Sequence, residues 1–575
     1  MIRCLIFIVL LIWIPVLMGA QSSVQRYDVV ITELMPDPSP VVSLPNAEYV
    51  EIRNNSHTSI NLAGWKLVTP SAASGSFPSY NLQPDSFLIL SSTSSAATFQ
   101  LYGRTIGVPS FPSLPNEGTV LSLMSKDGRT IHAVNYDAAW YHNDVKKEGG
   151  WSLEMIDLTI ACSGKGNWKA AVDVSGGTPG QRNSVAGSVA DKDPPRLVRT
   201  FCPDSVSIML LFDKTLDSSI GAVAGNYRLE SSSTAITAAF PQPPLFSQVL
   251  LKLNAALSPG RIHELTVSNL QDCSGNAIGG FNQAKVGLAQ SPGDHDLVIN
   301  EILFNPKPGG FDYVEIFNPS KKIIDLSRIF LGNRTSACVV SSLKRLAESG
   351  RCLFPGEFLV ANEEAVSLMN EYVVKWPEQV LALPSLPSYP DDKGCVILAD
   401  ATGRILDEVN YSEKWHFALI TNAEGVALER IDPTKPSDDP GNWHSASSTS
   451  GYGTPTAVNS QHHSLANAVN EILVEPKLFS PDNDGFNDIA SINYNFHEAG
   501  YLANITIFNS NGYVVRYLVK NNLLGFKGHW LWDGLDEQKK QLASGAYIVY
   551  VELFDLQGHR RSGKYPVTIA GKSSR

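Results

Sequence analysis

The chain has 575 residues, a net charge of −11, and 43% hydrophobic against 18% charged residues. A chain of this length is too long for one hydrophobic core, so we expect several domains. The acidic balance argues against a protein that grips nucleic-acid phosphates over a broad face, because such binding needs clustered Lys and Arg.

The N-terminus has the pattern of a secretory signal peptide. A basic start, Met1-Ile2-Arg3-Cys4, is followed by an apolar run through Met18 and then by Gly19-Ala20-Gln21. This order predicts a signal peptide over residues 1–20, cut after Ala20, with Cys4 too early to carry a lipid. No later stretch is apolar enough to span a bilayer. We therefore expect a secreted or cell-surface protein with no transmembrane segment after cleavage.

Two long passages of the chain repeat one another. The first reads "YDVVITEL", "AEYVEIRN", "WSLEMID" and "GGTPGQRNS"; the second reads "HDLVINEI", "FDYVEIFN", "VALERID" and "GYGTPTAVNS". Glu33 corresponds to Glu301, and Trp168 to Trp443. The alternation in Tyr49-Val50-Glu51-Ile52 is typical of a half-buried strand. Such self-similarity indicates one module used twice.

Each copy also contains a predicted β-hairpin. "GTVLSLMSKDGRTIHAVNY" and "GCVILADATGRILDEVNY" are apolar runs interrupted by Asp127-Gly128 and Thr402-Gly403. Gly after a small polar residue favours a tight turn between antiparallel strands.

The blocks "ITEL…EYVEIRN…INLAGWKL" and "INEI…DYVEIFN…IDLSRIFL" resemble the lamin-tail domain. The resemblance implies an Ig-like β-sandwich over residues 24–186 and a second over residues 294–460. The closing "WSLE", "NW" and "GTPG" series is similar to the bacterial extracellular form. In the second copy "LSRIF" replaces "LAGWK", so the resemblance does not predict its edge strands.

Two further segments are similar to other Ig-like domains. Residues 190–290 resemble bacterial Ig-like domains, through "DPP" near the start, Phe212-Asp213, and "DCSGN" near the end. After a linker at residues 461–469, residues 470–575 resemble the Ig-like domain of flagellar hook-capping proteins and the C-terminal sorting domains of type IX secretion. This resemblance implies that the secretion machinery is a partner. The fold class we predict is all-β, with tandem Ig-like β-sandwich modules.

Cysteine use is sparse in the predicted mature chain. Cys202 and Cys273 bracket the middle segment, so they could pair there. Cys338, Cys352 and Cys395 share another module and cannot all pair among themselves, and Cys162 is alone in a third. No CxxC is present, so the sequence predicts neither a zinc ribbon nor a thioredoxin-like site.

The motifs of common catalytic sites are missing. Gly558 to Lys564 matches the start of a phosphate-binding loop, but Tyr565 stands where Ser or Thr must be and a strand follows. We interpret that segment as a hairpin turn with basic flanks. There is no HExxH and no Gly-x-Ser-x-Gly elbow, and His462-His463 lie in the linker.

Two pairs of carboxylates could have either a catalytic or a structural role. Glu33 with Glu51, and Glu301 with Glu315, could act as acid and base if each pair lay in a cleft. The duplication retains them together with strand residues, as a fold requirement would. We interpret them as carboxylates that accept loop N–H groups at the end of a sandwich. The sequence therefore predicts no catalytic or cofactor-binding residue.

A ligand candidate lies in the C-terminal segment. "SPDNDGFND" offers calcium-loop oxygens from Ser480, Asp482, Asp484, the Phe486 carbonyl and Asp488. Ser491 replaces the bidentate Glu, and nothing suggests flanking helices. The alternative is an Asp/Asn/Gly turn held by its own side chains.

These features predict a non-enzymatic exported protein that acts in adhesion, envelope structure or extracellular recognition, with an extracellular protein or polysaccharide as its ligand. The alternative is an extracellular hydrolase or hydrolase accessory, because lamin-tail domains resemble appendages beside secreted nucleases and phosphatases. No companion catalytic domain is evident in the chain. Nucleic-acid binding has only the family analogy behind it and is disfavoured.

Overall fold

The structure is a computed structural model, and it describes residues 24–230, 233–335, 338–348, 350–420, 422–462, 471–482, 487–498 and 500–570. The predicted signal peptide lies outside the described residues. The chain divides into two compact units. The first comprises residues 1–199, 209–254 and 264–284, and the second residues 200–208, 255–263 and 285–575. We call residues 24–186 the first repeat and residues 294–460 the second repeat.

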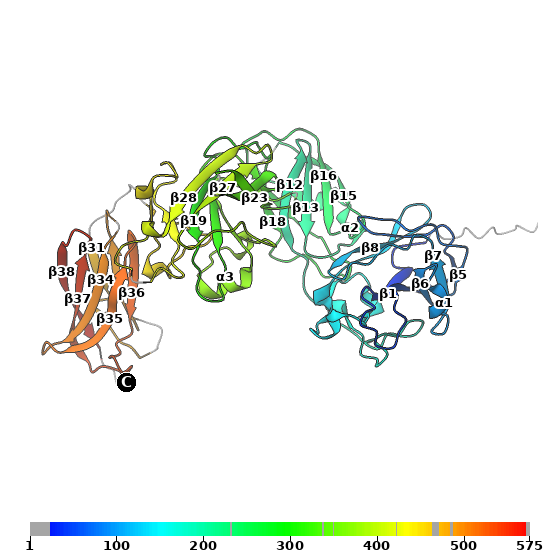
Figure 1. Cartoon of the computed structure of the whole chain (residues 1–575), viewed down its shortest axis with the longest axis horizontal. Helices are drawn as coiled ribbons and strands as arrows, with labels where there is room; N and C mark the ends of the chain where they lie inside the picture. The colour runs from blue at the N-terminus through cyan, green and yellow to red at the C-terminus, as the bar shows by residue number, and fades with distance from the viewer. Residues whose placement is uncertain are drawn as a thin grey trace, which may run out of the picture. The chain divides into compact units, whose positions relative to one another are not determined.

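The first repeat consists of two main sheets and one short one (Figure 1). The larger sheet has the strand order β11-β10-β1-β2-β6-β7, the smaller has the order β4-β8-β9, and β3 pairs with β5. The strands are β1 Val29–Met35, β2 Tyr49–Asn54, β3 Ile60–Asn61, β4 Lys66–Val68, β5 Asn81–Leu82, β6 Phe87–Ser92, β7 Thr105–Val108, β8 Gly118–Met124, β9 Thr130–Asp137, β10 Leu153–Met155 and β11 Trp168–Ala170.

The second repeat has the same arrangement with one addition. Its larger sheet runs β26-β25-β20-β19-β29-β30, and its second sheet runs β23-β22-β27-β28. The strands are β19 Val298–Leu303, β20 Tyr313–Phe317, β21 Ile324–Asp325, β22 Ile329–Arg334, β23 Val340–Arg345, β24 Cys352–Leu353, β25 Phe358–Asn362, β26 Val380–Ala382, β27 Lys393–Asp400, β28 Ile405–Ser412, β29 Leu428–Arg430 and β30 Trp443–Ser445. This addition lies at the sheet edge that the resemblance did not predict: β22 is longer than β4 of the first repeat, and β23 pairs with it as an extra strand.

The remaining segments are also built from strands. The middle segment, residues 190–290, contains β12 Leu197–Asp204, β13 Ser207–Phe212, β14 Tyr227–Leu229, β15 Ile236–Pro241, β16 Gln248–Leu253, β17 His263–Val267 and β18 Gln283–Val286. The C-terminal segment, from residue 471, forms the sheets β31-β33-β36 and β32-β38-β37-β34-β35. Its strands are β31 Glu471–Glu475, β32 Leu478–Phe479, β33 Ala490–Asn495, β34 Leu502–Asn509, β35 Val514–Leu523, β36 Lys527–Trp532, β37 Gly545–Phe554 and β38 Arg560–Ile569. The all-β, Ig-like fold class predicted from the sequence is confirmed.

Both predicted hairpins are confirmed. β8 pairs with β9 and β27 with β28, and Gly128 and Gly403 take φ of +80° and +84° in the turns. A positive φ is the conformation that glycine adopts at little cost, which explains the Gly after Asp127 and Thr402.

The half-burial predicted for Tyr49-Val50-Glu51-Ile52 is wrong, because all four side chains are fully buried. Val50 and Ile52 belong to the main core of the first repeat. On the opposite face, Tyr49 packs in a smaller cluster with Phe99 of the short helix α1, Ala96–Phe99. The sheet is therefore covered on both faces, which strand alternation alone does not reveal.

Helices are few among the described residues. Besides α1, they include α2 Ser218–Gly221 and α3 Ala365–Glu371. None of the helices in the described ranges is long and apolar enough to cross a membrane.

Candidate functional site: buried glutamates and domain junctions

Each repeat contains a cluster of three glutamates that are completely buried. In the first repeat, Glu33 of β1 lies opposite both Glu51 of β2 and Glu154 of β10. In the second repeat, Glu301, Glu315 and Glu429 occupy the same register on β19, β20 and β29. Because directly opposed residues of neighbouring strands place their side chains close together, three carboxyl groups meet on one face of the sheet.

A β-bulge beside the first glutamate supplies a donor to the second. The register shifts between Ile31 and Glu33, and the intervening Thr32 donates its hydroxyl to Glu51 Oε1 at 2.7 Å. The second repeat has the same shift, and its Asn300 donates an amide hydrogen to Glu315 Oε1 at 2.8 Å. Bulges often redirect a side chain in this way.

The carboxyl groups bind the segment that closes each repeat, which we call the strap: residues 176–185 in the first repeat and 452–461 in the second. Each glutamate accepts one backbone N–H from its strap. In the first repeat these bonds are Thr178 N to Glu33 at 2.9 Å, Gly180 N to Glu51 at 2.5 Å, and Val185 N to Glu154 at 3.0 Å. In the second they are Thr454 N to Glu301 at 2.9 Å, Thr456 N to Glu315 at 2.6 Å, and Gln461 N to Glu429 at 2.8 Å.

Hydroxyl groups complete the binding of the straps. Thr178 and Ser184 donate to Glu154, each at 2.7 Å. Thr454 donates to Glu429 at 2.9 Å and Ser460 donates to Glu429 at 2.8 Å. The repeated Gly-Thr-Pro and Asn-Ser sequences are therefore the part of the chain that the glutamates hold. The interpretation of these glutamates as acceptors of loop N–H groups is confirmed.

The glycine before each Thr-Pro is required by close approach. A Cβ at Gly177 would lie 2.6 Å from Glu33 Oε1 and 2.8 Å from the Tyr49 hydroxyl. At Gly453 a Cβ would lie 2.8 Å from the Tyr313 hydroxyl. The same tyrosines donate to Glu33 and Glu301. Any larger residue would push the strap away from its carboxylates.

Burial also governs the charge of the clusters. Desolvation, followed by the neighbouring carboxyl of Glu154, raises the pKa of Glu33. Desolvation and then Glu33 raise the pKa of Glu51 well above its ordinary value. In the second repeat, desolvation and then Glu301 raise the pKa of both Glu315 and Glu429. Three buried carboxyls cannot all ionise cheaply, so the clusters retain protons at pH values where exposed glutamates are charged.

Sequence reasoning named Glu33, Glu51, Glu301 and Glu315 but missed Glu154 and Glu429 as members of the clusters. The signal was present in Leu-Glu-x-Ile-Asp, which both copies keep. The tryptophan of the same phrase is buried in the core: Trp168 packs against Trp140, and Trp443 against Trp415, with ring centres 6.0 and 6.3 Å apart.

The two repeats use different side chains to accept the backbone N–H at the β-bulge. In the first repeat, Ile31 N donates to Nδ1 of buried His132, and His132 Nε2–H reaches the Ala161 carbonyl, each at 2.9 Å. Burial lowers the pKa of His132 to about 4, so the ring is neutral. In the second repeat, Ile299 N donates to Asp407, which forms an ion pair with Arg430 at 3.1 Å. Arg430 stands where the first repeat has Met155.

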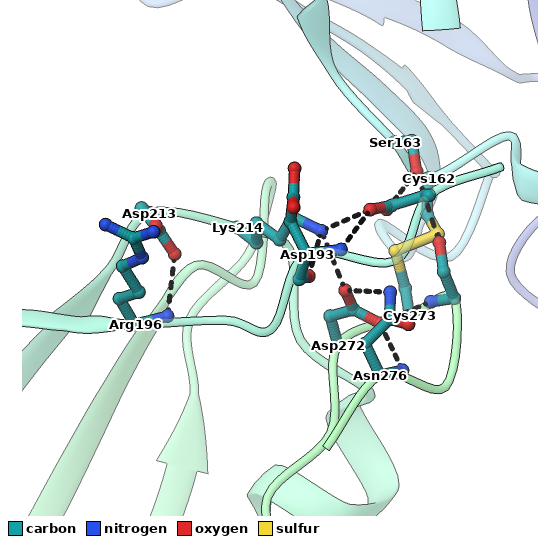
Figure 2. Close-up of polar contacts among 11 residues, drawn as sticks. Cys162, Ser163, Asp193, Arg196, Asp213, Lys214, Asp272, Cys273 and Asn276 are labelled. Carbon is teal, nitrogen blue, oxygen red and sulfur yellow. Dashed lines mark hydrogen bonds and ion pairs between the residues drawn. A yellow bond between two sulfur atoms is a disulfide. The ribbon is translucent and has the colours of Figure 1, made fainter. Parts of the chain in front are cut away.

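A disulfide joins the first repeat to the middle segment. Cys162 is bonded to Cys273, so the predicted pairing of Cys202 with Cys273 is wrong. The turn that carries Cys273 faces the loop of Cys162, whereas Cys202 lies on β12. Figure 2 shows Lys214 next to this disulfide; its amine pairs with Asp191 at 2.6 Å and with buried Asp272 at 3.1 Å. The junction is thus held by a covalent bond and by charge.

Hydrogen bonds to Asp272 hold the turn in the shape that this contact requires. Asp272 Oδ1 accepts the N–H groups of Ser274 and Asn276, each at 2.9 Å, which places Cys273 and Ser274 at the tip. Ser274 contacts the Ser163 hydroxyl at 3.1 Å. The "DCSGN" motif of the sequence is therefore an Asp-capped turn that docks on the first repeat.

The second strap contacts the C-terminal segment directly. Ser460 O accepts the N–H of Phe526 at 3.2 Å, and Ser448, just before the strap, donates its hydroxyl to Leu523 O at 2.8 Å. Phe417 packs with Leu502 and Leu523 in a small apolar cluster. The second strap therefore lies between the sheet of its own repeat and the C-terminal segment.

The predicted calcium residues are only partly described. Asp484 and Phe486 lie outside the described residues; Ser480, Asp482 and Asp488 lie within them. In the described ranges, no group of three or more His, Cys, Asp or Glu side chains could hold a metal ion. The calcium loop stays a prediction. The segment around Gly558 is the turn between β37 and β38, as expected for a basic-flanked hairpin.

One family matches part of the chain. Residues 22–138 match the Lamin Tail Domain. The lamin-tail match ends before β10, although β10 pairs with β1 in the same sheet. No curated protein matches the chain.

Several solved structures have some similarity to the chain. One is the N-terminal part of the bacterial S-layer protein SbsC, with 13% identity and a TM-score of 0.16. That match covers 29% of this chain and 39% of the SbsC chain. A tetra-tandem repeat from the extending region of a large adhesion protein has 11% identity, 94% and 99% coverage and a TM-score of 0.13. PorZ, a surface component of the type-IX secretion system of Porphyromonas gingivalis, has 10% identity, 92% and 81% coverage and a TM-score of 0.15. At such values we draw no function from these similarities.

Proposed function

We propose that this protein is an exported, non-catalytic, multi-domain protein of the cell surface or medium, acting in adhesion, envelope structure or extracellular recognition. The observation that carries the proposal is that the glutamates suited to acid–base chemistry are fully buried and bind the straps. A carboxyl group that holds a backbone N–H and has no exposed surface is not positioned to meet a substrate.

Two further observations support export. The N-terminal sequence has the order of a signal peptide. The Cys162–Cys273 disulfide fits an oxidising compartment, since disulfides persist mainly outside the cytosol. We extend the lamin-tail match by proposing that residues 294–460 form a second lamin-tail-like domain, because they repeat the strand order and the glutamate cluster of the first repeat.

We also propose that the C-terminal segment contacts the secretion machinery, with an extracellular protein or polysaccharide as the ligand of the exported chain. The sorting-type resemblance of residues 470–575 supports the first part. The modular β architecture supports the second, because loops at the ends of sandwiches are common recognition surfaces.

The second candidate function is an extracellular hydrolase or hydrolase accessory. The raised pKa values of the clustered glutamates favour it, because catalytic acids are often tuned by burial and by a like charge. The two functions predict different outcomes in one assay. The purified full-length protein would be screened on DNA, phosphate esters and polysaccharides beside a variant carrying Glu33→Gln and Glu301→Gln.

The proposal predicts no turnover by either protein. Turnover by the wild type that the double variant loses would overturn the proposal and support the hydrolase. A second experiment tests location: fractionation of the producing cells with the full chain and with a chain that lacks residues 470–575. We expect the full chain at the surface or in the medium and the shortened chain retained inside the envelope. Equal export of both would contradict the role of the C-terminal segment.

A further inference from the structure

The two repeats present equivalent faces. The next segment of the chain occupies the first face, whereas no described residue of the segment after the second repeat lines the second. In the first repeat the face comprises Arg26, Tyr27, His132, Cys162 and Ser163. The middle segment covers it: the Arg26 guanidinium stacks on the Phe246 ring at 3.8 Å, and the Asp272 turn docks through the disulfide and Ser274.

The second repeat places different side chains at the same positions. By the alignment of the repeated phrases, the counterparts of that face are Asp294, His295, Asp407, Ser437 and Asp438. The backbone is alike, since Tyr27 and His295 both adopt a positive φ, of +66° and +60°. These five residues line an open pocket between the start of the repeat, β28 and the loop before β30. The docking face of the first repeat is thus an open, polar pocket in the second.

No described residue of the C-terminal segment lines this pocket. The segment contacts the second repeat through Phe417, Ser448, Ser460 and Gln461, none of which lines the pocket. The chain therefore retains a docking geometry on the second repeat that the described residues do not use.

The charge of the pocket indicates what it would accept. Among its acids, Asp407 pairs with Arg430, Glu408 with Arg334, and Asp296 with Lys322. Asp294 has a longer contact of 3.5 Å with Arg404 and remains 74% exposed. Within the described ranges, no ion pair involves Asp438. Lys435 also lines the pocket, and Asp294 and Asp438 offer two negative charges to an incoming group, where the first repeat offers Arg26 and Ser163.

The chain itself contains a matching basic turn. The turn from Asp555 to His559 has the form of the docked Asp272 turn. In both, the first N–H bonds the fifth carbonyl, the fourth residue is a glycine with positive φ, and the aspartate accepts the fifth N–H. Turns of this form occur elsewhere in the chain, as at residues 400–404. The turn at 555–559 is distinguished because it leads into two exposed arginines, Arg560, which pairs with Glu552, and Arg561.

We propose that the pocket of the second repeat binds the 555–561 turn of a second copy of this chain. The pocket and the turn are different surfaces, so the contact is head-to-tail and can continue from copy to copy. Oppositely charged partners at an exposed site give an association that salt weakens. This inference concerns self-association and does not depend on where the protein acts.

Sedimentation equilibrium of the full-length protein, up to about 0.1 mM, tests the proposal. The variants are a pocket reversal, Asp294→Lys with Asp438→Lys, and a turn reversal, Arg560→Glu with Arg561→Glu. A matched control carries Glu117→Lys with Glu148→Lys, two exposed positions of the first repeat. We expect the mass of the wild type and of the control to rise with protein concentration and to fall with added salt.

Each reversal variant alone should associate at least about tenfold more weakly than the wild type, because like charges then face each other. A mixture of the two reversal variants should associate again, since each restores a complementary pair; this result also shows that both are folded. Three results would overturn the proposal: a monomeric wild type at every concentration, a pocket reversal that associates like the wild type, or a mixture of the reversals that stays monomeric.

Discussion

Glu33 accepts the backbone N–H of Thr178 at 2.9 Å, although 145 residues separate the two in the chain. The second repeat has the same bond, from Thr454 to Glu301, across 153 residues. Each bond joins the first strand of a repeat to its strap. Since the strap leads into the next segment of the chain, the glutamate clusters connect the interior of each repeat to that segment.

The strap threonines should be important for stability. Thr178→Val removes the hydroxyl that donates to Glu154, and Thr454→Val removes a hydroxyl that lies within hydrogen-bond distance of both Glu301 and Glu429. A buried acceptor left without its donor costs about 1–3 kcal/mol, so both variants should unfold at lower denaturant, with Thr454→Val affected more. Thr58→Val, at an exposed position, serves as the control and should change stability by less than about 0.5 kcal/mol. Equal stability of all three variants would contradict the role of the strap.

Stability should fall as the pH rises through the neutral range. Burial raises the pKa of Glu33 to about 7 and that of Glu429 to about 8, above the value in an unfolded chain. The folded state therefore binds more protons than the unfolded state. The stability that this binding contributes is fully present below the pKa of the glutamates in the unfolded chain, and it is lost as the pH rises through their pKa in the folded protein. Denaturant unfolding between pH 5 and pH 8.5 should show a loss on the order of 3 kcal/mol for each of these two glutamates.

Neutral glutamines provide the check on this assignment. Glu33 Oε2 has no hydrogen-bond partner, so Glu33→Gln can place its NH₂ there while its oxygen keeps the Thr178 N–H. The variant with Glu33→Gln and Glu429→Gln should lose part of the pH slope, because Glu51 and Glu315, whose pKa values are also raised, still bind protons in the folded state. A slope equal to that of the wild type would assign the pH dependence to other groups.

The two repeats place different buried pairs at the same two positions. The effects of substituting both positions on the free energy of unfolding should therefore be strongly non-additive. Arg430→Met alone leaves Asp407 buried without its partner and should cost about 3–5 kcal/mol. Adding Asp407→His recreates the His132 and Met155 combination of the first repeat, so the double variant should recover most of that loss. The free energies of unfolding of the four proteins in the double-mutant cycle measure the coupling. Additive effects would show that the two positions do not act as a pair.

The disulfide should stabilise the first unit. Replacing Cys162 and Cys273 with Ser releases a cross-link between residues 111 apart in the chain, which typically costs about 2–4 kcal/mol. Lys214 should keep part of the junction through Asp191 and Asp272. Cys338→Ser, at an exposed cysteine, is the control. If reductant left the unfolding midpoint of the wild type unchanged, the bond would not stabilise the junction.

The sequence was most informative where structure is local. The duplication, the strands around Val50 and Val314, and the hairpins at Gly128 and Gly403 follow from alternation and turn chemistry within a few residues. The family match independently covers part of the first repeat.

The features that could not be predicted are contacts between distant parts of the chain. Cys162 and Cys273 belong to different predicted domains, and only the fold brings their loops together. The burial of Glu51 was missed for a similar reason: a half-buried strand and a strand covered by a strap have the same alternation. Glu154 joins its partners through strand pairing with β1, more than a hundred residues earlier in the chain, which no local pattern encodes.

Native-state hydrogen exchange at the strap amides tests the central claim most directly. The amides of Thr178, Gly180 and Val185 should exchange as slowly as those of the buried strands, because each donates to a buried glutamate. Glu51→Ala should speed exchange at Gly180 first, by roughly tenfold or more, while the amides of β8 and β9 stay protected. Strap amides that exchange at the rate of an open loop in the wild-type protein would contradict the account.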